Sequence, residues 1–205
     1  MSPKIQARTI LEQRKMRQSQ IIDAALSIAL KDGASSITVA AVAKKAGIAR
    51  SSVYEYFSSS ADLVADLVME ELSIYQERLM TAVKDVQDPY RYIELWIAEA
   101  LEYVIDGRHL LVKSLNSAAI PEFRRGEIAQ GHRNLMASIA APLEQMGLED
   151  IRGAMSYLQN TIDVAATRIE SGHESALEIR NAQKYSLAGL RALAQDARRE
   201  EGRQI

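Results

Sequence analysis

Residues 37–57 read ITVAAVAKKAGIARSSVYEYF, and this stretch decides the fold of the N-terminal part of the chain. Thr38 is a residue type that caps helix N-termini. The apolar positions after it share one helical face: Val39, Val42, Ala43 and Ala46. Gly47 is expected to end this helix, because glycine adopts the left-handed conformation without steric cost. A second short helix is predicted from about Arg50 to Tyr56.

The flanking sequence predicts longer helices on both sides. Upstream, a helix is expected to start near residues 13–18 and to end at Gly33, with one apolar face made of Ile22, Ala25, Leu26, Ala29 and Leu30. Downstream, Ser59 and Asp62 have the spacing of a capping box. They introduce a helix whose buried side holds Leu63, Leu67 and Leu72. Two short helices joined by a tight glycine turn and held by a longer helix describe a helix-turn-helix, whose second helix enters a DNA major groove.

About 50 residues of this region resemble one known family. The matching positions are Ile21-Ile22-Asp23-Ala24-Ala25, Gly33, Ile37-Thr38-Val39, Val42-Ala43, Ala46-Gly47-Ile48, Ser52-Val53-Tyr54-Glu55-Tyr56-Phe57 and Asp62-Leu63. In this order and register they look like the DNA-binding domain of the TetR family of bacterial repressors. The resemblance implies that Arg50–Tyr56 is the recognition helix. The remaining residues resemble the family only in general character.

Seven residues are the candidates for DNA contact: Thr38, Lys44, Arg50, Ser51, Ser52, Tyr54 and Tyr56. Arg50, Ser51 and Ser52 open the recognition helix, where side chains reach base edges. Arg50 suits either a bidentate contact to guanine or a phosphate. For the two tyrosines the alternative is packing in the core. Core packing is also the preferred interpretation of Val53 and Phe57. For Lys44 and Lys45 the alternative is a solvated helix face.

Three positions depart from the family pattern. Ala49 stands where a capping Ser or Thr is usual, which removes about 1 kcal/mol of helix stabilisation. Ser60 replaces a phosphate-gripping lysine, and Glu55 places a carboxylate beside the expected phosphates. These departures support an alternative hypothesis, a dimeric interaction module whose helix-turn-helix no longer binds DNA.

The formal net charge of −2 hides an uneven distribution. Residues 1–58 carry nine basic and four acidic side chains, a net +5, whereas the rest of the chain carries 16 basic and 23 acidic ones, a net −7. A basic N-terminal quarter suits contact with a polyanion, although a solvated basic tail has the same composition. Arg14, Lys15 and Arg17 form a basic arm that either contacts DNA or frays.

The rest of the chain predicts only helices, near residues 62–85, 89–106, 108–117, 121–146, 149–171 and 174–199. Pro89 and Pro121 fit first turns, and Pro142 is expected to kink or break its helix. The fold class is therefore all-α. An N-terminal three-helix helix-turn-helix domain, residues 1–57, is followed by a larger helical ligand-binding and dimerisation domain, residues 58–205.

Two C-terminal helices carry the predicted dimer interface. One has a heptad-like seam of six residues: Ile151, Met155, Leu158, Ile162, Ala165 and Ile169. The last helix adds Leu190 and Leu193. The family resemblance implies that these helices pair with their copies in a second subunit, which would present two reading helices to a palindromic site. The alternative is a seam that packs only within the subunit.

Large side chains in the middle helices suggest an effector pocket, which the resemblance also implies. The candidates are Trp96, Tyr103, Phe123, Met136 and Tyr157, with Arg91, Arg108, His109 or Arg133 orienting a polar end. The alternative for each aromatic residue is plain core packing.

Other classes of protein fit the sequence poorly. The chain has no cysteine, which excludes disulfides, thiolate zinc sites, iron–sulfur clusters and thiol redox sensing. No phosphate loop, HExxH or GxSxG motif is present, so neither a catalytic site, a metal site nor a cofactor is expected. An all-α enzyme built in the aromatic cavity is the least favoured alternative. No apolar run reaches the ~18 residues of a membrane span. No signal peptide is visible, so a cytoplasmic protein is expected.

The sequence as a whole therefore predicts a homodimeric, ligand-responsive transcriptional repressor. It is expected to bind a palindromic double-stranded DNA operator and to be released by a small-molecule effector. The identities of the effector, the operator and the regulated genes do not follow from the residues.

Overall fold

The computed structural model describes residues 3–106 and 120–201, and all regular secondary structure in these ranges is helical. The predicted all-α class is thus confirmed. Contacts divide the chain into two compact units, residues 1–71 with 110–129 (unit 1) and residues 72–109 with 130–205 (unit 2). The predicted domain boundary after residue 57 stays a prediction, because contacts alone do not show which part folds independently.

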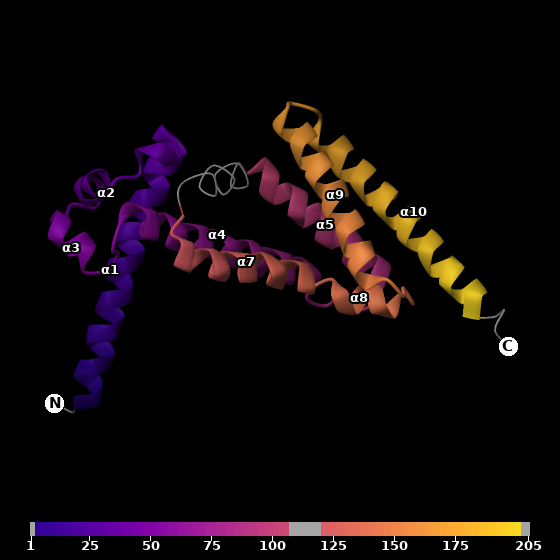
Figure 1. The fold of residues 1–205 in the computed structure, drawn as a ribbon, viewed down its shortest axis with the longest axis horizontal. Coiled ribbons are helices and arrows are strands. Elements are labelled where there is room, and N and C mark those ends of the chain that lie inside the picture. The colour runs from indigo at the N-terminus through magenta and orange to yellow at the C-terminus, as the bar shows by residue number, and fades with distance from the viewer. Residues whose placement is uncertain (1–2, 107–119, 202–205) are drawn as a thin grey trace. The chain divides into compact units, whose positions relative to one another are not determined.

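Unit 1 holds the predicted helix-turn-helix. Its elements are α1 (Pro3–Asp32), the short 3-10 turn η1 (Ala34–Ser36), α2 (Val39–Ala46), α3 (Arg50–Tyr54) and the first parts of α4 (Ser60–Val83) and α7 (Glu122–Ala137). Helices α2 and α3 lie beside α1, and the N-terminal end of α1 extends past them (Figure 1). The predicted start of the first helix near residues 13–18 was therefore wrong. Residues 3–17 hold good helix formers without an apolar stripe, so they form a helix that periodicity does not reveal.

The core of unit 1 joins residues from each of its main helices. Its side chains that are at most 1% exposed include Ile21, Val42, Val53, Phe57, Leu63 and Leu67. The inward positions predicted for Val53 and Phe57 are confirmed. Leu30, predicted on the buried face of α1, is 62% exposed. The buried stripe of α1 runs instead through Ile21, Ala25 and Ile28, and Leu30 falls outside its arc.

The predicted caps and turns of unit 1 are present. The Thr38 hydroxyl oxygen accepts a hydrogen bond from the Ala41 amide at 3.1 Å. Gly47 has φ 68°, in the left-handed region, and the Ile48 amide reaches back to the Ala43 carbonyl at 3.0 Å. This closing bond belongs to the turn that aims α3 away from α2. The Ser59 hydroxyl likewise accepts from the Asp62 amide at 3.1 Å, which starts α4.

Unit 2 contains the remaining parts of α4 and α7, together with α5 (Pro89–Ile105), α8 (Ala140–Gln145), α9 (Ile151–Glu170) and α10 (Ser175–Glu201). Helices α9 and α10 lie side by side (Figure 1). Pro89 occupies the first turn of α5 as predicted, after the N-cap Asp88. The helix expected at 108–117 lies outside the described residues. None of the described helices has both the length and the apolar character needed to cross a membrane.

The helix predicted over 121–146 is broken into α7 and α8. Pro142 lies in the first turn of α8, and it has no N–H to donate to the Ser138 carbonyl four residues earlier. The Tyr92 hydroxyl donates to that carbonyl instead, at 3.1 Å. Nearby, the Trp96 indole N–H donates to the Ser138 hydroxyl oxygen at 3.0 Å. Two α5 side chains therefore bind Ser138 where the proline interrupts the helix, Tyr92 its carbonyl and Trp96 its hydroxyl.

We expect Ser138→Ala to lower the free energy of unfolding by about 1–3 kcal/mol, because the buried Trp96 N–H then has no acceptor. Urea unfolding followed by the fluorescence of this single tryptophan measures the change. Ser156→Ala is the control, since that exposed hydroxyl donates only to the Arg152 carbonyl of its own helix. Equal stability of the two variants would contradict this role for Ser138.

Candidate functional site

Helix α3 presents a polar first turn to solvent. Arg50 and Ser51 are exposed, and Ser52 is half-buried. Arg50 has no ion-pair partner among the described residues, so its guanidinium is available to a ligand. The N-cap position, Ala49, makes no side-chain hydrogen bond, as its residue type predicts. The three residues proposed to read base edges thus lie together on one short helix turn.

The large residues after this turn divide into a buried pair and a more exposed pair. Val53 and Phe57 are at most 1% exposed, whereas Tyr54 is 57% exposed and Tyr56 is half-buried. Tyr54 is therefore not a core residue. Its hydroxyl is a donor that suits a phosphate oxygen.

The start and the end of α2 add further donors. Thr38 is exposed, and while its oxygen caps α2, its hydroxyl hydrogen can still be donated to an anion. Lys44 and Lys45 are both exposed in the last turn of α2. Both lysines therefore have the exposure that a phosphate contact requires.

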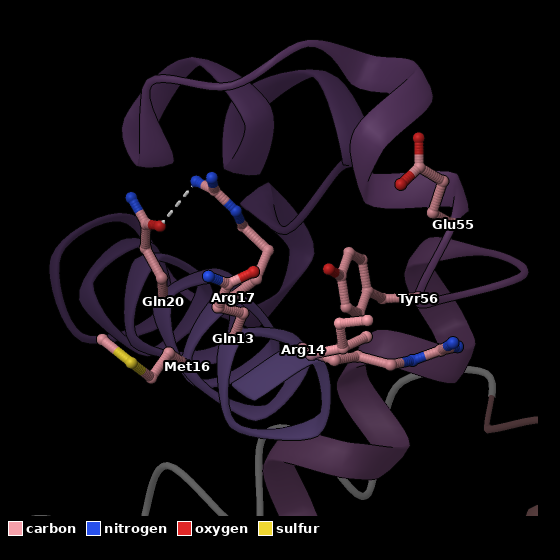
Figure 2. A pocket seen from close by; sticks show the side chains of 8 residues that line it. Gln13, Arg14, Met16, Arg17, Gln20, Glu55 and Tyr56 are labelled. Atoms are coloured by element: carbon pink, nitrogen blue, oxygen red, sulfur yellow. Dashed lines mark hydrogen bonds between the residues drawn. The ribbon is translucent and has the colours of Figure 1, made fainter. Parts of the chain in front are cut away.

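The basic arm is part of helix α1 and lines a groove with the end of α3. This α1–α3 groove has a volume of about 760 Å³ and is lined by Ile10, Gln13, Arg14, Met16, Arg17, Gln20, Glu55 and Tyr56. Figure 2 shows Arg14 beside the Tyr56 ring, with 5.6 Å between the guanidinium carbon and the ring centroid. Arg17 donates to Gln20 at 2.9 Å, and Gln20 donates to the Ala46 carbonyl at 3.0 Å. The residues predicted as either DNA contacts or a frayed end are therefore helical.

Polar contacts at this groove went unpredicted from the sequence. Gln20 binds the last turn of α2 from α1, 26 residues away. A glutamine on an exposed helix face carries no signal of such a bond in its own sequence context. Glu55 is the one carboxylate among the residues that line this groove.

The five predicted effector residues are not gathered at one place. Trp96 and Tyr103 are at most 3% exposed and share α5 in unit 2. The Tyr103 ring stacks on Tyr75 with centroids 4.2 Å apart. Met136 is half-buried on α7 of unit 2, whereas Phe123 belongs to unit 1 and is 70% exposed. The fifth residue, Tyr157, lies in a different setting on α9. Arg108 and His109 lie outside the described residues.

A groove between α9 and α10 contains Tyr157 and the predicted dimer residues Leu158, Ala165, Leu190 and Leu193. It has a volume of about 1310 Å³. Leu158, Ile162, Ala165 and Leu190 are buried within the chain, whereas Ile151, Met155 and Ile169 are half-buried. The exposed apolar side chains of the groove are Tyr157, Val164, Tyr185 and Leu193. The middle of the predicted seam thus packs inside the chain, and a second stripe on α9 faces outward.

This second stripe was missed because α9 carries two apolar stripes. The seam at Leu158 and Ile162 has the stronger pattern of large aliphatic residues. Tyr157 and Val164 are seven residues apart and share the neighbouring face, with the small Thr161 between them. Among the described residues no group of three or more metal-ligating side chains is present.

Comparisons with known proteins agree with this architecture. Residues 21–67 match the model of the bacterial regulatory proteins of the tetR family. The chain is 26% identical over 189 residues to the fatty acid metabolism regulator protein of Bacillus subtilis strain 168, which covers 88% of this chain and 92% of that protein. Two solved structures share its fold: the transcriptional regulator FadR of Bacillus subtilis in complex with stearoyl-CoA, at 23% identity, and a TetR-like transcriptional regulator of Rhodococcus sp. RHA1, also at 23%. The FadR structure superposes with a TM-score of 0.68 over 83% of this chain and 98% of that chain. For the Rhodococcus protein the values are 0.66, 85% and 95%.

The matched residues 21–67 span the core of α1, the two short helices and the start of α4, which are the elements that present Arg50 and Tyr54. The helix-turn-helix region of this chain thus matches the bacterial regulatory proteins of the tetR family, as the sequence predicted, and the chain is a DNA-binding transcriptional regulator.

Proposed function

We propose that the chain is a homodimeric repressor that binds a palindromic operator in the cytoplasm and is released by a long-chain fatty acyl-CoA. The observation that carries the effector is the 26% identity to a fatty acid metabolism regulator over 92% of that protein's length. The shared fold with a regulator in complex with stearoyl-CoA supports it. We propose that the chain acts by binding alone and catalyses no reaction.

For the effector we propose Trp96, Tyr103 and Met136 of unit 2 as contacts of the acyl chain, because a fatty tail needs an apolar lining. Trp96 and Tyr103 are already enclosed by protein, so a tail that reaches them has to displace neighbouring side chains. Tyr157 is assigned to the α9–α10 groove instead. Phe123 stays a prediction without a structural partner.

Stearoyl-CoA is expected to raise the dissociation constant for operator DNA at least about tenfold, which corresponds to a coupling of about 1.4 kcal/mol. Fluorescence anisotropy with DNA from the upstream region of the protein's own gene measures this, with stearate and coenzyme A as separate controls. Binding of the DNA that stays unchanged at saturating stearoyl-CoA would contradict the proposed effector.

For DNA we propose contacts from Thr38, Lys44, Arg50, Ser51, Ser52, Tyr54 and Tyr56. The support is that all seven lie on one helix-turn-helix, where five are exposed and Ser52 and Tyr56 are half-buried, with exposed cations around them. Arg50 is proposed to read a base and Lys44 to bind a phosphate. These roles differ in a measurable way, because phosphate contacts are independent of sequence and depend on salt.

Arg50→Ala is therefore expected to lower the preference for operator over unrelated DNA by about 1–3 kcal/mol. Lys44→Ala should weaken both DNAs equally and reduce the log–log salt slope by about one ion. Arg152→Ala, an exposed arginine of α9, serves as the control for loss of charge. If Arg50→Ala weakens binding to all sequences equally, Arg50 contacts phosphate only.

For the dimer we propose that a second copy of this chain covers the α9–α10 groove. Tyr157, Val164, Tyr185 and Leu193 leave an apolar surface there that a packed copy would remove from water. A two-fold pairing of α9 and α10 makes a four-helix arrangement and presents two α3 helices to two half-sites. The predicted residues Ile151, Met155 and Ile169 are half-buried and add to the proposed contact.

The double variant Val164→Asp, Tyr185→Asp is expected to be a monomer, since a charge in an apolar interface is costly. Light scattering after size exclusion should give twice 22.7 kDa for the unmodified chain and 22.7 kDa for the variant. Leu177→Asp is the control, because Leu177 is 42% exposed on α10 and does not line the groove. A monomeric unmodified chain at micromolar concentration would contradict the proposed interface.

A further inference from the structure

Arg124, in the first turn of α7, binds three carboxylates within unit 1. Its Nη1 lies 2.7 Å from Asp62 and its Nε 2.7 Å from Glu127, while its Nη2 pairs with Asp66. The side chains of Arg124 and Asp62 are both only 14% exposed, and that of Asp66 is 24% exposed. We call Arg124, Asp62 and Asp66 the Arg124 cluster. Each of the three guanidinium nitrogens of Arg124 pairs with a different carboxylate. The single ammonium group of a lysine cannot reproduce this arrangement.

Asp62 connects the cluster to the end of the recognition helix. Its Oδ1 binds Arg124, while its Oδ2 accepts both the amide and the hydroxyl of Ser58, each at 3.0 Å. Ser58 directly follows Phe57, the residue that anchors the chain after α3 in the core. Burial by itself raises the pKa of Asp62, but the hydrogen bonds from Ser58 and Arg124 outweigh it and keep this pKa below its ordinary value. The carboxylate is therefore charged when it fixes the link from α3 to α4.

Asp66 connects the same cluster to α1. One carboxylate oxygen binds Arg124, and the other accepts a hydrogen bond from the Gln18 side chain at 3.1 Å. Gln18 directly follows Arg17, which lines the α1–α3 groove. Through two aspartates, Arg124 is thus tied to α1 and to the link that follows α3.

The composition of the cluster makes it sensitive to a shift of α7. Asp62 and Asp66 are four residues apart on α4, so without Arg124 two partly buried like charges would repel each other on adjacent turns. Both α4 and α7 begin in unit 1 and continue into unit 2, where the effector is proposed to bind. A movement of either helix along its length changes the distance between Arg124 and the aspartates.

We propose that Arg124 is a positioning residue for operator binding, that its pairing with Asp62 and Asp66 holds α1 and the end of α3 in the DNA-binding arrangement, and that the effector acts by opening this pairing. The proposal rests on the proposed function. It assigns a role to a residue that contacts neither DNA nor effector.

The test compares Arg124→Ala and Arg124→Lys with Arg125→Ala in the full chain. Arg125 is the matched control, because it is the next residue, is exposed and forms no ion pair within the described part of the chain. Without ligand, Arg124→Ala should weaken operator binding about tenfold, and stearoyl-CoA should then change the affinity by less than about threefold. Arg124→Lys should lie between Arg124→Ala and the unmodified chain, and Arg125→Ala should match the latter.

The ratio of operator affinities with and without stearoyl-CoA separates positioning from stability, since a merely structural role lowers the melting temperature without changing this ratio. A folded Arg124→Ala or Arg124→Lys variant with an unchanged ratio overturns the proposal. Adding Asp66→Asn to Arg124→Ala should cause little further loss of operator affinity, because the pair is already broken. A full additive loss would also count against it.

Amide hydrogen exchange at Ser58 gives a readout that needs neither DNA nor effector. Exchange should be faster in Arg124→Ala than in Arg125→Ala, because Asp62 then holds the Ser58 amide less firmly. If the unmodified chain binds no operator, the proposed function fails, while faster exchange at Ser58 still supports the positioning role. Equal exchange in both variants overturns that role.

Discussion

The DNA-binding part of this protein depends on the burial of two side chains, Val53 and Phe57. Helix α3 has only five residues and no side-chain cap, whereas an isolated helix needs about 12–15 residues to be even marginally stable in water. Burial of a large apolar side chain contributes about 1.5–3 kcal/mol, which exceeds the roughly 1 kcal/mol lost with the missing cap. Tertiary packing, more than local sequence, therefore holds Arg50 and Ser51 in place.

The helix-turn-helix could be predicted from the sequence because local residue types mark the ends of its helices. Its helices are short and each end is marked locally, by Thr38 before α2 and Gly47 after it. The break between α7 and α8 follows from Pro142. The helix is interrupted near Ser138, four residues earlier, because Pro142 has no N–H to donate to the Ser138 carbonyl. The start of α1 and the burial of Leu30 were predicted wrongly, because a solvated helix carries no apolar period and a cluster of five apolar residues does not fix the helix phase.

The candidate sites were predictable only in part, because contacts between residues far apart in the sequence leave no local pattern. Residues on the first turn of α3 follow from the helix-turn-helix pattern itself. The partners of Arg124 are 58 and 62 residues away, and such a pairing has no periodicity to detect. On α9 the period was read correctly, but two apolar stripes share that period, and only the packing of α10 shows which stripe faces outward.

If the packing of Val53 and Phe57 preforms α3 before DNA binds, the amides of residues 55–57 should be protected from hydrogen exchange in the free chain. In the structure the amides of Glu55, Tyr56 and Phe57 donate to carbonyls of Ser51 and Val53. We expect these amides to exchange about as slowly as those of the α1 core at Ile22 and Ala25, and operator DNA to change their exchange little. Rapid exchange that slows only when operator DNA is added would show that α3 folds on binding and is not preformed by packing.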